Sequence, residues 1–139
     1  MDQISQTILH TGKFLTLTQE GHWEYVDRVH GTGAALIIGV TTEQKVLLVE
    51  QYRIPVHART IELPAGIIGD EPGDTHESSV AAARRELLEE TGYAAGRIED
   101  ITVHEIPLVD VGKWLEAKAK TGVLIDPKIC VGLFFITPN

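Results

Sequence analysis

The first part of the chain shows the apolar and polar patterns of β-strands. Residues 13–19 (KFLTLTQ) alternate apolar and polar side chains. Residues 22–29 (HWEYVDRV) continue the pattern after a Glu-Gly pair suited to a turn. Residues 33–40 (GAALIIGV) form a continuous apolar run, and 45–53 (KVLLVEQYR) follow closely. These segments predict two hairpins, the second one buried.

A short strand is predicted over 60–66 (TIELPAG), where Pro64 and Gly66 would end it. Helical periodicity follows. Asp74, with Glu77 three residues later, resembles a capping box, and Gly92 stands where the helix would end. The predicted apolar stripe of this helix consists of Val80, Ala81, Leu87 and Leu88.

The remaining sequence predicts one more strand and two more helices. Residues 101–108 (ITVHEIPL) have the composition of a strand, and 109–122 that of an amphipathic helix ended by a glycine. Residues 126–136 predict a final helix with Pro127 in its first turn. Strands first and helices later predict an α+β fold with a mixed sheet flanked by helices and an N-terminal hairpin region.

The length of 139 residues suits one domain, 1–139, and the net charge of −8 argues against a general nucleic-acid surface. A divalent metal can still invert the local charge and allow a phosphorylated small molecule to bind. The single cysteine, Cys130, excludes a disulfide within the chain. Without a signal peptide or an apolar run of membrane-spanning length, a cytoplasmic protein with no membrane partner is expected.

The segment RRELLEETG (84–92) brings three carboxylates together. On a helix, Glu86 and Glu90 lie one above the other, with Glu89 beside them. Like charges at this spacing repel each other unless a cation lies among them. Two interpretations are open at this point: a solvated surface helix, or a binding site for a hard divalent cation, which prefers oxygen ligands.

The spacing around these glutamates resembles the Nudix box, G-x5-E-x7-R-E-U-x-E-E-x-G-U, in which U is a bulky aliphatic residue. From Glu77 onward every specified position matches, if Tyr93 is accepted at the last one. The glycine position departs from the pattern, because Glu71 stands where the box glycine should be and Gly66 is the better candidate. The loop between Gly66 and Glu77 is therefore longer than in the family pattern.

The resemblance implies a Nudix fold, an α/β/α sandwich, and a metal site. By analogy with the family, Glu86, Glu89 and Glu90 would bind Mg²⁺ or Mn²⁺ and act in catalysis, together with the backbone carbonyl of Ala65. Four residues would have structural roles in the box: Gly66, Glu77, Arg85 and Gly92.

Three flanking segments, WEYVDR (23–28), VEQYR (49–53) and IELPAG (61–66), resemble the ADP-ribose pyrophosphatase branch of this family. The resemblance implies that Trp23 stacks on adenine and that Glu24 contacts the base. It also implies that Arg28 and Arg53 hold phosphate or ribose, since an arginine fork binds phosphate bidentately. The alternatives are an ordinary half-buried strand aromatic for Trp23, and surface or dimer ion pairs for the two arginines.

Members of this branch are commonly homodimers in which the N-terminal strands cross to the partner, so residues 1–31 are expected to dimerise and 32–139 to form the Nudix core. These strands alone would make a poor independent core, which agrees with that expectation.

Members of this branch have several tens of residues more at this point, so a segment is expected to be missing between Ile98 and Glu99. Two explanations are open: a naturally shortened chain, or a mobile segment left out of this sequence, which is the preferred one. The missing part includes a strand pair and an acidic loop that carries a base or a metal ligand. Glu99 matches the end of that loop and is the candidate for this role, with Asp100 as competitor and a charged turn residue as the alternative.

Two histidines, His76 and His104, are expected to be structural rather than general bases. Trp114 and Cys130 are expected in the core.

The predicted function is metal-dependent hydrolysis of ADP-ribose to AMP and ribose 5-phosphate. The alternatives are another nucleotide sugar, NADH or a dinucleoside polyphosphate as substrate, or a Nudix-like domain that senses such a ligand without cleaving it.

Overall fold

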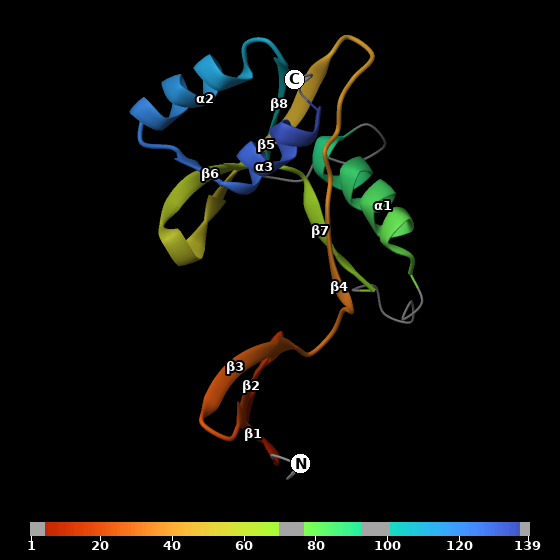
Figure 1. The fold of residues 1–139 in the computed structure, drawn as a ribbon, viewed down its shortest axis with the longest axis vertical. Coiled ribbons are helices and arrows are strands. Elements are labelled where there is room, and N and C mark those ends of the chain that lie inside the picture. The colour runs from red at the N-terminus through yellow and green to blue at the C-terminus, as the bar shows by residue number, and fades with distance from the viewer. Residues whose placement is uncertain (1–4, 70–76, 93–100, 137–139) are drawn as a thin grey trace.

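The computed structural model describes residues 5–69, 77–92 and 101–136 (Figure 1). The strands in this part of the chain are β1 (Gln6–Thr11), β2 (Leu15–Glu20), β3 (Trp23–Arg28), β4 (Gly33–Leu36), β5 (Lys45–Arg53), β6 (Ala58–Glu62), β7 (Ala65–Ile68), β8 (Thr102–Pro107) and β9 (Leu124–Ile125). The helices are the short 3₁₀ helix η1 (Ile54–Val56), α1 (Ser79–Thr91), α2 (Val111–Lys120) and α3 (Lys128–Ile136). The predicted α+β class is confirmed.

The N-terminal strands form their own antiparallel sheet in the order β1-β2-β3, which stands apart from the rest of the molecule in Figure 1. The predicted hairpin is confirmed: Leu15 pairs with Arg28 at one end and Glu20 with Trp23 at the other. Gly21 makes the turn between them at a φ of 61°, a backbone conformation that glycine adopts easily.

The second predicted hairpin is mostly wrong. The strand that begins at Gly33 ends at Leu36, and β4 pairs with β7 rather than with β5. After Leu36 the backbone pairs outside β7: Ile37 N–H donates to the carbonyl of Pro64. A single bridge, Val40 to Val46, remains of the expected pairing with β5.

The predicted strand over 60–66 is divided in two. Its first part belongs to β6, in the sheet ordered β8-β5-β6-β9, and its second part belongs to β7, beside β4. Pro64 lies between them and has no N–H to donate to a ladder, so the chain changes sheets there. This crossing brings Ala65 and Gly66 toward α1, which packs along β4 and β7.

The strand and the two helices predicted after residue 100 are confirmed as β8, α2 and α3. They enclose a core of buried apolar side chains: Val46, Leu48, Ile61, Leu63, Ile106, Val111, Leu115 and Ile129. Trp114 packs against this core as predicted. The prediction for Cys130 is wrong, since that side chain is exposed on α3 next to the buried Ile129.

Two details of α1 differ from the prediction. The N-cap is Ser78, whose hydroxyl accepts from Ala81 N–H, so Glu77 precedes the helix and does not stand inside a capping box. Asp74 lies outside the described residues. The prediction that the apolar stripe of this helix faces the core is also wrong, because Val80 and Leu88 are exposed.

Among the described helices, none is both long and apolar enough to cross a membrane.

Candidate active site

Both ends of α1 are fixed locally. Its first turn is capped by Ser78, with a distance of 3.2 Å from Ala81 N to the serine Oγ. At its other end Gly92 has a φ of 70° and donates its N–H to the carbonyl of Leu88. Gly92 therefore has the helix-ending conformation expected of the box glycine.

Arg85 joins α1 to the segment in front of it. Its Nε and Nη2 atoms lie 3.1 and 3.2 Å from the two carboxylate oxygens of Glu77, and Nη2 also donates to the carbonyl of Ile67 at 3.2 Å. Glu77 in turn accepts from Gly69 N–H at 3.0 Å. The hydrogen bonds from Arg85 and then from Gly69 lower the pKa of Glu77. Glu77 and Arg85 thus form an ion pair, and together with the bond to Ile67 this pair fastens the helix to β7.

The remaining Nη1 group of Arg85 lies between two of the box glutamates. It is 2.8 Å from an oxygen of Glu86 and 3.3 Å from an oxygen of Glu89. The cation that the like charges require is therefore supplied in part by the arginine of the same motif.

Glu90 is held differently. One of its oxygens accepts from the backbone N–H of Ala65 at 3.2 Å. Burial raises the pKa of Glu90 to about 7, with a further increase from the negative charges of Glu86 and Glu62, although the Ala65 hydrogen bond and Arg53 oppose the change. Burial therefore disfavours the ionised form of Glu90, and a cation bound beside it would stabilise that form.

Gly66 provides the space for the Glu86 side chain. A Cβ atom at this position would lie 1.8 Å from Cδ and 2.0 Å from Cγ of Glu86. Any other residue at position 66 would therefore displace that carboxylate.

The donor set fits a hard divalent cation, since carboxylate oxygens and a neighbouring backbone carbonyl are the ligands that Mg²⁺ accepts. Within the described ranges, however, no three His, Cys, Asp or Glu side chains already form a metal-binding group. Glu86 and Glu89 turn to Arg85, whereas Glu90 turns to the Ala65 N–H. The site would have to rearrange these side chains in order to gather the ligands.

Arg53, at the end of β5, is near this site. Its pKa is raised by hydrogen bonding to Glu62 and, further, by the charges of Glu90 and Asp126. Glu62 was not singled out in the sequence, although its position just before the Leu-Pro-Ala-Gly segment could have drawn attention to it.

The other proposed substrate residues lie elsewhere in the single chain. Trp23, Glu24 and Arg28 are all on β3 in the separate N-terminal sheet (Figure 1), and the Trp23 side chain is 68% exposed. Trp23 lies on one face of β3, while Glu24 and Arg28 lie on the other, because side chains alternate along a strand. One chain alone does not bring these three residues to the α1 carboxylates.

Several other predictions concern residues outside the described ranges: Glu71, His76, Tyr93, Glu99 and Asp100. The position of the expected gap, between Ile98 and Glu99, also lies outside them. His104 can be described. Its Nε2 lies 2.8 Å from Glu50, which also accepts from Arg59 and Lys118 at 2.8 and 2.7 Å. This arrangement agrees with the structural role expected for His104.

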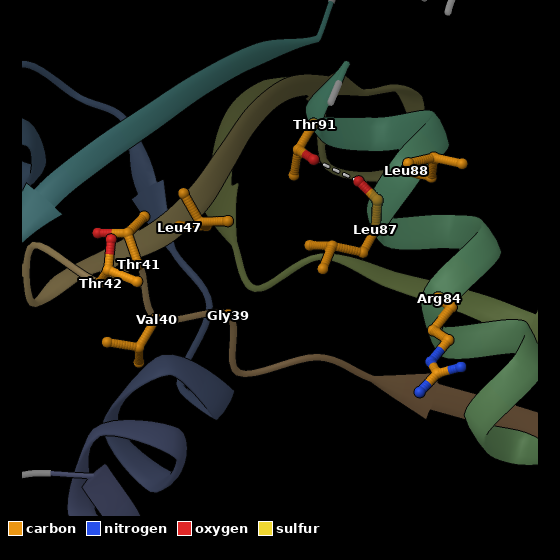
Figure 2. A pocket seen from close by; sticks show the side chains of 9 residues that line it. All are labelled: Gly39, Val40, Thr41, Thr42, Leu47, Arg84, Leu87, Leu88 and Thr91. Carbon is orange, nitrogen blue, oxygen red and sulfur yellow. Dashed lines mark hydrogen bonds between the residues drawn. The ribbon is translucent and has the colours of Figure 1, made fainter. Parts of the chain in front are cut away.

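A cavity of about 660 Å³ lies beside α1 (Figure 2). The helix lines it with Arg84, Leu87, Leu88 and Thr91, which follow one another at helical spacing. Figure 2 shows these side chains opposite the chain from Gly39 to Thr42, with Leu47 between them. The predicted apolar stripe thus faces an open cavity in part, and this cavity contains none of the acidic residues of the box.

The sequence matches the family model of the NUDIX domain over residues 31–125. The chain is 42% identical over 72 residues to the ADP-ribose pyrophosphatase of Bacillus subtilis (strain 168). The aligned segment covers 50% of this chain and 35% of that protein. It is 41% identical over 73 residues to the methanol dehydrogenase activator of Bacillus methanolicus, covering 51% of this chain and 36% of that protein. The chain therefore spans little more than a third of the length of these relatives.

The fold is similar to that of a crystal structure of an ADP compounds hydrolase, with a TM-score of 0.65 and 16% sequence identity. This match covers 95% of this chain and 89% of that one, and at such identity it concerns the fold alone. Because the family model spans well over half of the sequence and the fold agrees with it, the chain belongs to the Nudix domain family.

Proposed function

We propose that this protein hydrolyses the diphosphate of a nucleoside diphosphate linked to another group, with ADP-ribose as the substrate and AMP and ribose 5-phosphate as the products. The observation that carries the proposal is the arrangement around α1. Gly66 leaves space for Glu86, the Ala65 N–H fixes Glu90, and the Glu77–Arg85 pair fastens the helix in place.

In this proposal Glu86, Glu89 and Glu90, with the carbonyl of Ala65, hold Mg²⁺ or Mn²⁺. When bound, the metal polarises the phosphoryl group and lowers the pKa of a water molecule. The protein fixes the helix against β7 through Arg85, so the helix that carries the carboxylates would keep its place as charge develops on the phosphate. The base that accepts the proton of the water is proposed to be Glu99 or Asp100, outside the described residues.

Arg53 is the proposed phosphate clamp within the same chain. Its guanidinium side chain is 45% exposed, and the charge of Glu90 acts on it. A guanidinium at this position could donate to the oxygens of a diphosphate that binds at the metal site which the α1 carboxylates would form.

We further propose that a second copy of the chain supplies the adenine and ribose contacts, Trp23, Glu24 and Arg28. Large apolar side chains of the N-terminal sheet are exposed in the single chain: Ile8, Leu9, Phe14, Leu15, Trp23 and Val26. A small sheet with this much exposed apolar surface gains stability by packing against a partner. A homodimer would bury it and bring β3 of one chain to the α1 site of the other.

A panel of substrates tests the choice among enzymes. With Mg²⁺ present, the release of AMP from ADP-ribose is expected to exceed turnover of a GDP-sugar, NADH and a dinucleoside polyphosphate. Fast turnover of another compound and none of ADP-ribose would contradict the proposed substrate.

A domain that senses its ligand without cleaving it is the second candidate. The present conformation favours it, because Glu86 and Glu89 turn to Arg85 and Glu90 turns to the Ala65 N–H. Its signature would be calorimetric binding of ADP-ribose with no turnover of any compound in the panel.

A further inference from the structure

The last residues of two neighbouring strands form a bidentate ion pair. Arg53 ends β5 and Glu62 ends β6. The distances are 2.7 Å from Arg53 Nε to Glu62 Oε1 and 2.6 Å from Nη2 to Oε2. Two parallel charge-assisted hydrogen bonds fix the plane of a guanidinium group as well as its position.

The sheet register explains how the two side chains meet. Arg53 pairs with Ala58 and Gln51 with Thr60, whereas Glu62 pairs further along with Val49. Residues directly opposite each other share a face of the sheet, so Arg53, Thr60 and Glu62 lie on one face. The arginine side chain therefore runs back along the ladder, past Thr60, to reach the carboxylate.

Thr60 also binds the carboxylate of Glu62. Its hydroxyl donates to Oε1 of Glu62, the same oxygen that accepts from Arg53 Nε. The Glu62 side chain is 14% exposed, against 45% for Arg53. The anchored member of the pair is therefore Glu62, and the more exposed Arg53 is the member held by it. Within the described part of the chain, Nη1 of Arg53 has no hydrogen-bond partner.

The pair stands beside the α1 carboxylates. Glu62 is close enough to Glu90 for their charges to interact, and so is Arg53. The parallel pairing of β6 with β9 adds Asp126 and Lys128 to the same neighbourhood. The guanidinium group thus lies within a charged cluster that includes a proposed metal ligand. Because no described residue bonds to Nη1, that edge of the group is available to a ligand.

We propose that Glu62 is a positioning residue, which orients Arg53 so that its unused Nη1 edge binds a substrate diphosphate oxygen. This inference rests on the proposed function of Arg53 as a phosphate clamp. Glu62 itself does not touch the substrate and does not bind the metal. Thr60 assists by fixing the Glu62 carboxylate.

A double-mutant cycle tests this role. Arg53→Ala, Glu62→Gln and the double variant are compared with the unchanged protein in hydrolysis of ADP-ribose with Mg²⁺, and thermal melting checks that each is folded. Arg53→Ala is expected to raise KM by roughly tenfold or more, since it removes a charged hydrogen bond to the substrate. Glu62→Gln is expected to raise KM about fivefold and to leave kcat within about twofold.

The decisive result is the double variant. If Glu62 acts through Arg53, adding Glu62→Gln to Arg53→Ala changes KM by less than about twofold. Losses that multiply, or a fall in kcat with KM unchanged, would mean that Glu62 acts directly on metal or water and would overturn the inference.

Glu43→Gln is the matched control, because it removes an ion pair with Lys45 of 2.6 Å at an exposed position. Its KM is expected to stay unchanged. If Glu62→Gln does not fold, Thr60→Val replaces it. That variant keeps the Glu62 charge and removes only the hydroxyl donor, and its expected effect is a rise in KM of about twofold that disappears in the Arg53→Ala background. An unchanged KM in Thr60→Val would then overturn the inference.

The two proposals fail in different ways. Turnover of ADP-ribose with independent effects of Arg53 and Glu62 would leave the function standing and remove the positioning role. Calorimetry could instead show that ADP-ribose binds but is not turned over. If Arg53→Ala and Glu62→Gln then weaken binding non-additively, the hydrolase proposal fails and the positioning role stands. Neither turnover nor binding would overturn both.

Discussion

At the residue scale, the positions of the box glutamates are decided by their neighbours Gly66, Ala65 and Arg85. The absence of a side chain at Gly66 admits Glu86, and the Ala65 N–H fixes Glu90. The positive charge of Arg85 offsets the negative charges around it, since Arg85 pairs with Glu77 and with two glutamates of the helix, Glu86 and Glu89. The geometry of the proposed metal site therefore depends on three residues, Gly66, Ala65 and Arg85, that are not among its proposed carboxylate ligands.

Gly66→Ala is predicted to abolish most activity while the protein stays folded. The new Cβ would meet side-chain atoms of Glu86 at about 2 Å, and a flexible glutamate moves more easily than the backbone around it. We expect kcat/KM for ADP-ribose to fall by at least about tenfold, because a displaced ligand no longer supports the transition state. Steady-state kinetics and circular dichroism measure the two effects.

Gly112→Ala is the matched control for this substitution. Gly112 lies within α2, and a Cβ there meets nothing within 4 Å. Activity should not change, and the melting temperature should rise slightly because alanine favours a helix by about 1 kcal/mol over glycine. Normal activity in Gly66→Ala would show that the position of Glu86 is unimportant.

The sequence could identify the candidate site residues by type and spacing but not by conformation. The spacing of the glutamates and of Arg85 is visible in a single helix, so these residues could be found. Glu62 acts across two strands, and its pairing with Arg53 depends on a sheet register that no local pattern shows. The contact between Gly66 and Glu86 likewise requires the fold.

At the element scale, Glu50 connects four elements. It lies on β5 and accepts from Arg59 of β6, His104 of β8 and Lys118 of α2. Burial by itself would raise the pKa of this carboxyl group. Hydrogen bonds from Lys118, Arg59 and His104 outweigh that effect and lower the pKa to about 2. The network therefore fastens α2 to the sheet.

Glu50→Gln is predicted to lower the free energy of unfolding by about 2 kcal/mol at neutral pH, because three donors would lose a buried charged acceptor. Since the folded pKa is lowered, the stabilisation is complete above the unfolded value of 4.5 and is lost as the pH falls toward about 2. Urea denaturation at several pH values should show the difference from the unchanged protein shrinking over that range.

Glu43→Gln again serves as the control, because the Glu43 side chain is 71% exposed and its pair with Lys45 lies on the surface. It should change stability by less than about 0.5 kcal/mol. A Glu50→Gln protein as stable as the control, or a difference independent of pH, would refute the role given to the network.

The sequence predicted those elements whose apolar pattern fits one strand or one helix along its whole length. It did not predict elements whose bounds depend on pairing with distant segments. β5, β8, α2 and α3 follow their patterns closely because each is apolar on one side or throughout. The run from Gly33 to Val40 looks like one strand, yet it divides its hydrogen bonds among β7, Pro64 and β5. α1 begins later than predicted because Ser78 provides the cap.

At the scale of the whole molecule, the N-terminal sheet is the feature that points to a second copy of the chain. It stands apart from the α1 site (Figure 1), and apolar side chains on both of its faces are exposed. One face combines Val26 and Leu15 with Glu24 and Arg28, so a partner that covers it would also enclose two of the proposed substrate residues.

Val26→Asp is predicted to convert a dimer into a monomer, since a carboxylate would have to be buried without a partner at the interface. Analytical ultracentrifugation at micromolar concentration should give twice the mass of one chain for the unchanged protein and the mass of one chain for the variant. KM for ADP-ribose should rise along with dissociation.

Val131→Asp provides the comparison, because Val131 on α3 is 60% exposed, as is Val26. It should leave the mass and KM unchanged. A dimer that persists in Val26→Asp would place the interface elsewhere.

The most direct test of the central claim is hydrolysis of ADP-ribose with Mg²⁺ by the unchanged protein and by Glu90→Gln, measured side by side. Glu116→Gln, an exposed glutamate on α2, is the control and should behave like the unchanged protein. The account predicts AMP release by the unchanged protein and a near-complete loss in Glu90→Gln, because the amide cannot supply the anionic oxygen that a divalent cation requires. Full activity in Glu90→Gln, or no activity in the unchanged protein, would contradict it.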